Sequence, residues 1–461
     1  MQSKVLRFSG RVEREQAGSY GYIPFEVPEW ARTIVIQYVY RGYSEGECVV
    51  DIGLFEPGSL NLIEGMEHFR GWSGSNKKTF YVSERSATPS YIPGSLKPGV
   101  WHVILGFYKV PPGGCEYEVV VTLTDEARTE SRAIEPEPGN AGGKSGWVKG
   151  DFHVHSVHSD GDSTLREITA KARELGLDFV AVTDHNTHSH IAELGYRSAF
   201  IEGVLLLKGV EVTTYKGHFN AFGVSFTPEF RFKSESELLR VTRHLRKKGA
   251  VLSVNHPKPL GPDWEWATMS FAHLVEVFHA IWEFNNYISL RKWDEQLKRG
   301  ARLGLIGGSD AHRVKGCGGI SQFGAPTTWV YVDELSERGL LEGLLRQRVF
   351  ISKSPEGPRV ELAVRSVGEL VHMGGTAKAS CVKVVVSVAG ATRQQARLIS
   401  DRGVEAVWTL DEDSFTKFLE LDARDLGFIR LEVLGEVCDA WDPYHRENLL
   451  SALTAPIFFE R

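Results

Sequence analysis

The spacing of hydrophobic residues changes twice along the chain and divides it into three regions. Residues 1 to about 145 carry short apolar or alternating runs, such as TIVIQYVY and GVWHVILGFYKV, separated by glycine and proline turns. Many short strands of this kind predict an antiparallel sandwich or jelly roll. The turn-rich segment EPEPGNAGGKSG that follows predicts a linker.

A different pattern begins at Gly146, where strand-like runs alternate with helical segments such as TLREITAKARELGL and SESELLRVTRHLRKKG. This alternation of strands and helices predicts parallel strands joined by helical crossovers, and therefore an open α/β sheet or a barrel. From about Pro358 the β pattern returns, for example in KVVVSVAG and FIRLEVLG. The predicted domains are therefore 1–145, 146–357 and 358–461, with a β-sandwich at each end.

Length and composition are those of a globular protein with several domains: 461 residues, 42% hydrophobic and 24% charged. No apolar run reaches the roughly 20 residues of a membrane span, and the start of the chain lacks a secretory signal. The cysteines are odd in number and far apart, which argues against disulfides and thiolate metal sites: Cys48, Cys115, Cys317, Cys381 and Cys438. We expect a cytoplasmic protein without membrane partners, and its net charge of -6 gives no general attraction for nucleic acid.

Histidines are concentrated in the middle region, where predicted strands end. Twelve of the sixteen lie between His153 and His312. His153 and His155 leave the same face of one extended segment. Because the carboxyl ends of barrel strands converge on one mouth, nine candidate ligands would meet there. They are His153, His155, Asp160, His185, Glu211, His218, His256, Asp310 and His312.

Neutral imidazoles with a few carboxylates suit Zn, Mn or Fe. The set is too large for one ion, so we expect two or three divalent metal ions with Glu211 shared between two of them. Such a centre lowers the pKa of a bridging water and stabilises the attacking and leaving oxygens of a displacement. Asp184 and Asp151 are candidates for orienting the ligand imidazoles.

The motifs GDFHVHSVHSDG, VTDHN, GVEVTTYKGH, VNHP and GGSDAH resemble the ordered motifs of the PHP (polymerase and histidinol phosphatase) superfamily, and within it the carbaryl hydrolase-like CehA/McbA branch. The resemblance implies an α/β fold with a distorted (β/α)7 barrel and a metal centre usually used for phosphoester hydrolysis. It also implies three metal positions: His153, His155, Glu211 and Asp310; Glu211, His218 and His256; Asp160, His185 and His312.

Other residues of the middle region have less specific assignments. His218 is a candidate general acid, a role in competition with metal ligation, and Asp184 is a further catalytic candidate. Lys258 and Arg313, which follow VNHP and SDAH, could bind a phosphate, with a solvated or ion-paired cation as the alternative. The remaining histidines stay outside the ligand set, although the first two could line the mouth: His158, His188, His190, His244, His273 and His279.

Three functions remain open from the sequence. The first is a metal-dependent phosphoesterase with a metal-bridging hydroxide as nucleophile, and the second is a carboxyl or carbamate ester hydrolase with the same centre. The third is a non-catalytic scaffold stabilised by metal. The expected substrate is a small-molecule phosphoester or ester, with nucleic acid only as substrate fragments. In the N-terminal region Trp72 and Trp101 could be carbohydrate platforms, with core packing as the alternative for Trp101.

Overall fold

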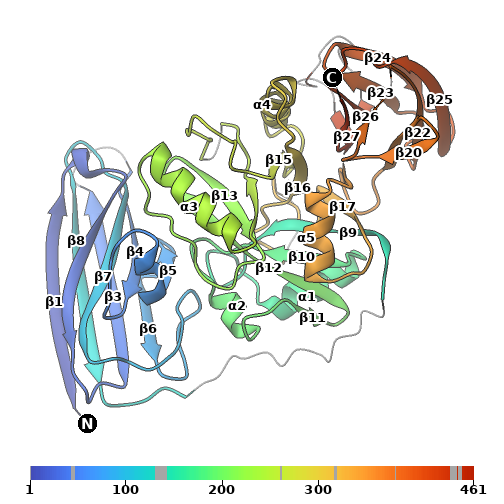
Figure 1. Ribbon diagram of the computed structural model, residues 1–461. Coiled ribbons are helices and arrows are strands. Elements are labelled where there is room, and N and C mark those ends of the chain that lie inside the picture. The colour runs from blue at the N-terminus through green and yellow to red at the C-terminus, as the bar shows by residue number, and fades with distance from the viewer. Residues whose placement is uncertain are drawn as a thin grey trace.

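The computed structural model describes residues 2–42, 47–129, 143–259, 262–315, 319–378, 380–436, 444 and 449–460. It is a mixed α/β fold in which strands predominate, and Figure 1 shows three groups of elements that follow one another along the chain. Most of the predicted linker lies outside the described residues. Within the described parts of the chain, no helix has the length and apolar character needed to cross a membrane.

The first group contains two four-stranded antiparallel sheets with strand orders β1-β8-β3-β6 and β2-β7-β4-β5. Its elements are β1 (Ser3–Val12), η1 (Arg14–Gln16), β2 (Ser19–Val27), β3 (Thr33–Gly42), β4 (Val49–Phe55), η2 (Glu64–His68), β5 (Phe69–Gly74), β6 (Thr79–Ser83), β7 (Gly99–Lys109) and β8 (Cys115–Thr124). Both sheets contribute alternate side chains to one buried cluster, including Phe25, Ile36 and Trp101. Trp101 is fully buried and Trp72 is 4% exposed, so both are core residues and not surface platforms.

A disulfide joins Cys48 to Cys115 in this first group, so the prediction against disulfides is wrong for this pair. The two cysteines are 67 residues apart in sequence, but the pairing of β3 with β8 brings Gly42 opposite Cys115, and Cys48 follows Gly42 closely in sequence. Cys381 is free and exposed. Cys317 and Cys438 lie outside the described residues. The expected cytoplasmic location thus loses one of its arguments and stays a prediction.

The middle group is built on the strand path β16-β15-β14-β13-β12-β10-β9-β17-β18. The strands are β9 (Gly146–Val154), β10 (Phe179–Val182), β11 (Ala199–Ile201), β12 (Val204–Thr214), β13 (Gly217–Phe222), β14 (Val251–Val254), β15 (Leu274–His279), β16 (Gly304–Gly308), β17 (Thr327–Val332) and β18 (Val349–Ser352). The path returns on itself, because the segment after β16 contacts β9: the His155 amide donates to the Ala311 carbonyl at 3.0 Å.

Strict alternation of strands and helices would make all of these strands parallel, but some of them are antiparallel. β9, β10 and β12 are parallel, and so are β14, β15 and β16, but β13 pairs antiparallel with both β12 and β14. The turn between β12 and β13 has only two residues, followed by Gly217 at φ +117, a conformation that favours glycine. This hairpin replaces one of the expected helical crossovers.

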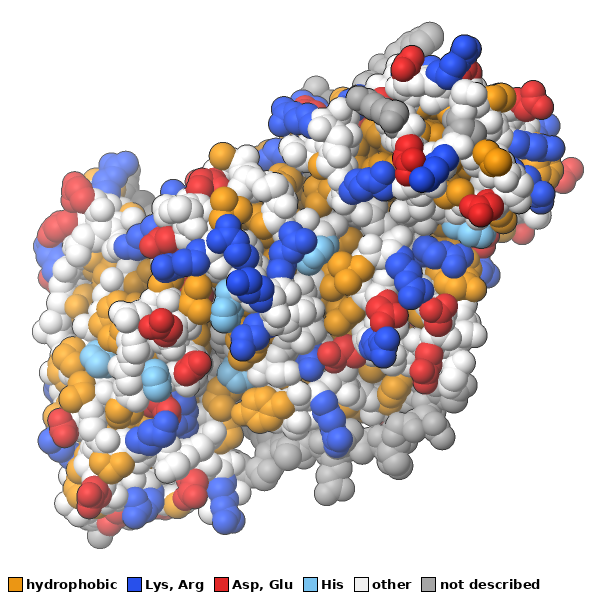
Figure 2. Space-filling model, in the orientation of Figure 1, with side chains coloured by type: hydrophobic (Ala, Val, Ile, Leu, Met, Phe, Trp, Pro, Cys, Tyr) orange, Lys and Arg blue, Asp and Glu red, His pale blue; other side chains and the backbone are white. Residues whose placement is uncertain are grey.

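The α-helices of the described chain all belong to the middle group: α1 (Leu165–Glu174), α2 (Ser189–Glu193), α3 (Glu235–Lys247), α4 (Asn286–Lys298) and α5 (Glu337–Leu345). Local sequence explains where three of them begin, because the side chains of Thr164, Ser234 and Ser336 cap the first turns of α1, α3 and α5. Figure 2 shows Lys and Arg side chains gathered near the centre of one face, in the area where Figure 1 places α3.

The last group continues the sheet of the middle group, because β18 pairs with β27 and the path runs on through β26, β23 and β24. A separate four-stranded sheet has the order β20-β19-β22-β25. The strands are β19 (Arg359–Ser366), β20 (Glu369–His372), β21 (Thr376–Ala377), β22 (Cys381–Ala389), β23 (Gln395–Ser400), β24 (Gly403–Thr409), β25 (Ser414–Asp422), β26 (Phe428–Glu436), β27 (Leu449–Thr454) and β28 (Ile457–Phe459). The sheet therefore crosses the boundary that we predict at 357.

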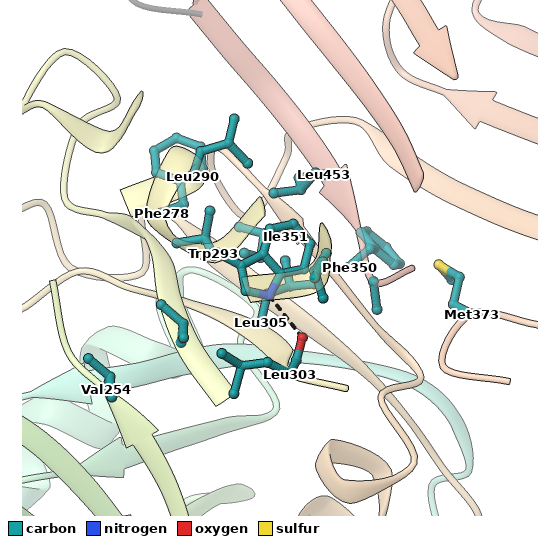
Figure 3. Packing of buried hydrophobic residues seen from close by; sticks show 14 of the residues in the cluster. Val254, Phe278, Leu290, Trp293, Leu303, Leu305, Phe350, Ile351, Met373 and Leu453 are labelled. Atoms are coloured by element: carbon teal, nitrogen blue, oxygen red, sulfur yellow. Dashed lines mark hydrogen bonds between the residues drawn. The ribbon is translucent and has the colours of Figure 1, made fainter. Parts of the chain in front are cut away.

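The core beneath this junction is centred on Trp293 of α4 (Figure 3). The ring is fully buried in a cluster that includes Phe350 and Ile351 of β18 and Leu453 of β27, and its Nε1 donates to the Leu303 carbonyl at 2.8 Å. The helix α4 thus joins the middle and last groups through Trp293 and also through Asp294, which accepts a hydrogen bond from Arg430 of β26.

We predict that Trp293→Ala lowers the free energy of unfolding by about 3–5 kcal/mol, because truncation of a buried aromatic leaves a cavity and an unpaired carbonyl. Urea unfolding followed by circular dichroism measures the change. The control is Leu345→Ala, since Leu345 is 50% exposed at the end of α5. A loss no larger in Trp293→Ala than in the control would show that this core does not hold the two groups together.

Candidate metal centre

The predicted ligands converge at one end of the middle sheet. His153 lies near the end of β9, and His155 directly follows that strand. Glu211 is on β12 and forms a parallel bridge with His185. Combinations of the nine predicted ligands form groups whose ligand atoms lie within 4.8 Å of one another. The groups are His155, Asp160, His185 and His312; His153, His256 and Asp310; His153, His155 and Glu211; His185, Glu211 and His218.

The Glu211 carboxylate lies at the centre of the cluster and faces different histidines with its two oxygens. Oε1 is 3.3 Å from His153 Nε2, 3.2 Å from His218 Nδ1 and 3.4 Å from His256 Nε2. Oε2 is 3.5 Å from His155 Nε2 and 2.9 Å from His185 Nδ1. A carboxylate in this position can bridge two metal ions, as the sequence predicts for Glu211.

Asp310 and Asp160 provide the other two carboxylates. Asp310 Oδ1 is 3.3 Å from His153 Nε2 and 2.9 Å from His155 Nε2. Asp160 Oδ1 is 3.3 Å from His312 Nε2 and 3.6 Å from His185 Nε2. The three metal positions that the PHP resemblance implies agree only in part with the groups in space. His155 joins Asp160, His185 and His312, whereas His256 is grouped with His153 and Asp310, and His185 also with Glu211 and His218. The assignment of ligands to separate ions stays a prediction.

Several of these atoms are buried and make no hydrogen bond within the described chain: Nε2 of His153 and His155, Oε2 of Glu211 and Oδ1 of Asp310. A buried polar atom without a partner costs about 1–3 kcal/mol, so four of them at one point are unusual unless another group completes the site. The donor set is nitrogen and oxygen without thiolate, which is the set that Zn, Mn and Fe accept. The residues present fit divalent metal ions.

The electrostatics of the cluster also favour cations. Burial would raise the pKa of Glu211, but the neighbouring imidazoles of His153 and His185 hold it well below its usual range. Burial would lower the pKa of His312, yet Asp160 and Asp310 raise it to about 10. Burial together with His312 and His185 lowers the pKa of His155 to about 4, so that ring is neutral, the form that binds a metal.

A second layer of residues orients the ligands, and two of its members are not among the predicted residues. Glu276 Oε1 is 3.0 Å from His153 Nδ1, and Oε2 accepts the His256 amide at 2.9 Å. His279 Nε2 is 3.1 Å from Asp310 Oδ2. Both residues belong to β15, whose sequence is LVEVFH. A charged residue inside an apolar run is the sequence signal from which Glu276 could have been identified.

Asp184 and Asp151 bond mainly to the backbone and hydroxyls beside the predicted ligands, and Asp184 approaches one ligand ring indirectly, because Ser159 Oγ, which donates to it, lies 3.5 Å from His155 Nδ1. The Asp184 carboxylate accepts bonds from the amide and hydroxyl of Ser156 and from the Ser159 hydroxyl, and it contacts His190 at 3.1 Å. Asp151 accepts the amides of residues 153, 309 and 324. Neither carboxylate touches the imidazole of a predicted ligand. They fix the backbone that carries the ligands.

The cluster opens into a cavity of about 250 Å³ whose walls include His218, Lys258 and His279. Lys258 is 2% exposed and donates to the carbonyls of His279 and Phe284 and to Asn286 Oδ1. Burial lowers its pKa to about 7. Its three hydrogens are therefore already held by the protein, which reduces its capacity to bind a phosphate.

Arg313 lies in a neighbouring cavity of about 610 Å³ that also contacts Asp310 and His312. Its side chain is exposed and has no ion pair with the described residues. His158 and His188 line neither cavity, because His158 bonds Ser189 and Glu193 and His188 bonds Thr227 at 2.8 Å.

Comparison with known proteins finds the PHP domain at residues 151–290, a segment that contains every predicted ligand except Asp310 and His312. The chain is 32% identical over 80 residues to the DNA polymerase/3'-5' exonuclease PolX of Bacillus subtilis, covering 14% of this chain and 14% of that protein. It is 37% identical over 68 residues to the phosphoribosyl 1,2-cyclic phosphate 1,2-diphosphodiesterase of Eggerthella lenta, covering 14% of this chain and 24% of that protein. The chain thus spans less than a quarter of each of these relatives.

Two solved structures are similar at low TM-score. One is a two-domain protein containing a predicted PHP-like metal-dependent phosphoesterase from Bacteroides vulgatus, with a TM-score of 0.38, 21% identity and coverage of 70% of this chain and 99% of that chain. The other is PsfC from Pseudomonas syringae, with a TM-score of 0.31, 18% identity and coverage of 43% and 88%.

We predict that the purified protein, stripped by chelation and reloaded with Mn²⁺ or Zn²⁺, binds at least two ions per chain, because the ligands form more than one group around Glu211. Elemental analysis gives the stoichiometry. The variant Asp310→Ala should bind at least one ion fewer, and its melting temperature should rise less on metal addition. The control is Asp333→Ala, whose side chain is 73% exposed and pairs only with Arg346 in the described chain. Equal stoichiometry in both variants would rule out Asp310 as a ligand.

Proposed function

We propose that the protein is a PHP-type metal-dependent phosphoesterase that acts on a small-molecule phosphoester. The observation that carries the proposal is the convergence of His153, His155, Glu211 and Asp310, each of which has a buried ligand atom that makes no hydrogen bond within the described chain. Divalent ions bound there supply Lewis acidity toward phosphoryl oxygens and make a water molecule acidic enough to be a nucleophile at neutral pH. The match to the PHP domain supports this function, as does the similarity to the diphosphodiesterase of Eggerthella lenta.

The chain's own residues then have the following roles. Glu211 would hold the ions together with the histidines around it, since its two oxygens face different sets of imidazoles. Glu276 fixes the ring of His153 through Nδ1, which leaves Nε2 as the ligand atom. His218 lines the cavity and stays both a ligand and a candidate proton donor for the leaving group. Asp184 positions the loop after β9 through Ser156 and Ser159, and this positioning role replaces the catalytic role predicted for it.

Arg313 is our candidate for binding the phosphate oxygens that the metals do not hold. It is exposed beside Asp310 and His312, and a guanidinium can donate two parallel bonds to a phosphate. Lys258 forms part of the cavity wall, and its hydrogen bonds to the carbonyls of His279 and Phe284 hold the end of β15 and the segment that follows it.

The test is hydrolysis of p-nitrophenyl phosphate, bis-p-nitrophenyl phosphate and p-nitrophenyl acetate by metal-loaded protein. We expect turnover of a phosphate ester that falls by more than about 100-fold in Asp310→Ala, because loss of a ligand exceeds the 10–100-fold effect of losing an outer-shell partner. Asp333→Ala is the control and should keep its activity.

Turnover of the acetate alone would contradict the phosphoesterase and favour the carboxyl or carbamate ester hydrolase. A protein that binds metal and hydrolyses none of the three would favour the metal-stabilised scaffold. The ratio of monoester to diester rates indicates which class of phosphoester the site takes.

A further inference from the structure

A second cavity, of about 350 Å³, opens from the metal centre on the side of the first group of strands. It shares Asp160, His185 and His218 with the metal centre. Its other walls come from the sheet containing β4, β5 and β7 and from the turn between β12 and β13, and they include Asp51, Tyr108, Lys109, Thr213 and Tyr215. We call it the Asp51–Tyr108 cavity.

Aromatic faces form one wall of this cavity. Tyr108 and Tyr215 are stacked with ring centroids 4.9 Å apart and an interplanar angle of 14°. Tyr20 extends the stack behind Tyr215, at 5.6 Å. Both Tyr108 and Tyr215 line the cavity and are partly buried. Tyr215 is stacked against both Tyr108 and Tyr20, so Tyr108 is the ring that can present a face, and Lys109 Nζ lies 5.3 Å from its centroid.

A buried carboxylate adjoins these rings. Asp51 is 9% exposed, and its Oδ2 accepts a hydrogen bond from the Tyr215 hydroxyl at 2.8 Å. Its Oδ1 has no hydrogen bond with the described residues, although Asp51 lines the cavity. A carboxylate oxygen in a partly enclosed site needs a donor, and ligand hydroxyl groups are suitable donors.

The backbone is adapted to hold these groups together. Gly106 of β7 faces the Tyr215 hydroxyl so closely that a Cβ there would lie 2.2 Å from it. A larger residue at position 106 would push the turn between β12 and β13 away from the first group of strands. The position of Tyr215 therefore depends on the absence of a side chain on the opposite strand.

The charges of the cavity disfavour a second anion. Glu47, Asp51 and Asp160 are part of the wall, and Lys109 is paired with Glu47. A carboxylate with an aromatic face beside it is suited to a neutral ring with hydroxyl groups, since the ring stacks on the aromatic face and the hydroxyls donate to the carboxylate.

We propose that the Asp51–Tyr108 cavity binds a sugar ring on the substituent that the phosphate keeps during hydrolysis. This inference rests on the proposed phosphoesterase function and narrows its substrate to phosphodiesters with a glycosyl or nucleosidyl group. Tyr108 stacks on the ring, and Asp51 accepts from neighbouring hydroxyls. The leaving group occupies the cavity beside Lys258 and His279, on the other side of the shared histidines.

The kinetic test uses two diesters with the same scissile bond: the p-nitrophenyl ester of uridine 5′-phosphate and methyl p-nitrophenyl phosphate. The wild-type protein should prefer the uridine ester in kcat/KM. Tyr108→Ala should reduce this preference about tenfold, the loss expected when one stacking face is removed. Tyr40→Ala removes the same side chain from a partly buried position on β3 that does not line the cavity, and should keep the preference.

The binding test needs neither metal nor turnover. Calorimetry should detect uridine and methyl β-D-ribofuranoside binding to the metal-free protein, both weakened about tenfold by Tyr108→Ala. Wild-type protein should bind uridine more tightly than 2′-deoxyuridine, and Asp51→Asn, which keeps the size of the side chain and an acceptor for Tyr215, should remove this difference.

The kinetic and binding results distinguish failure of the proposed sugar subsite from failure of the proposed phosphoesterase function. Absence of binding by both ligands, or binding that is the same in Tyr108→Ala and Tyr40→Ala, would overturn the proposed subsite even if phosphate esters are hydrolysed. Uridine binding without binding of the riboside would assign the cavity to the base and would also overturn the proposal. Binding as expected, with no phosphoester hydrolysed, would support the sugar subsite and contradict the phosphoesterase.

Discussion

The arrangement of the site depends on one buried carboxylate surrounded by imidazoles. Glu211 is fully buried, and five histidine nitrogens lie within 3.5 Å of its oxygens. A carboxylate removed from water needs nearby positive charge, and the neighbouring imidazoles satisfy this need only in part, since burial keeps His155 neutral. Metal ions between these groups would pair the charges and also use the buried atoms that have no hydrogen bond.

The rest of the fold holds the ligands around that carboxylate. Parallel pairing of β9 with β10 brings His153 and His155 close to His185, and the hairpin at Gly217 brings His218 opposite Thr213, two residues from Glu211. The first group of strands also contributes, since Asn76 and Lys77 both donate to the Ser159 carbonyl at 2.7 Å, next to Asp160. The first group of strands therefore fixes the backbone beside one predicted metal ligand and, in our proposal, selects the substrate.

The sequence was sufficient to select nine side chains that the structure brings together and to predict the strand-rich character of both ends, because polar residues at strand ends and alternating apolar residues leave local patterns. The missing parts depend on contacts between distant segments. Glu276 becomes a partner of His153 only through the order of β9, β15 and β16, and the disulfide of Cys48 depends on the register of β3 and β8. The same is true of the sheet that continues from β18 into β27. The barrel and sandwich classifications and the CehA/McbA branch stay predictions.

The most direct test of the account is a crystal structure of the Mn²⁺-loaded protein with anomalous diffraction recorded near the manganese edge. The account predicts two or three anomalous peaks, one of them between Glu211 and Asp310 and a second between Glu211, His218 and His256. A single peak, or peaks away from Glu211, would contradict the claim that this carboxylate bridges a centre of several metal ions.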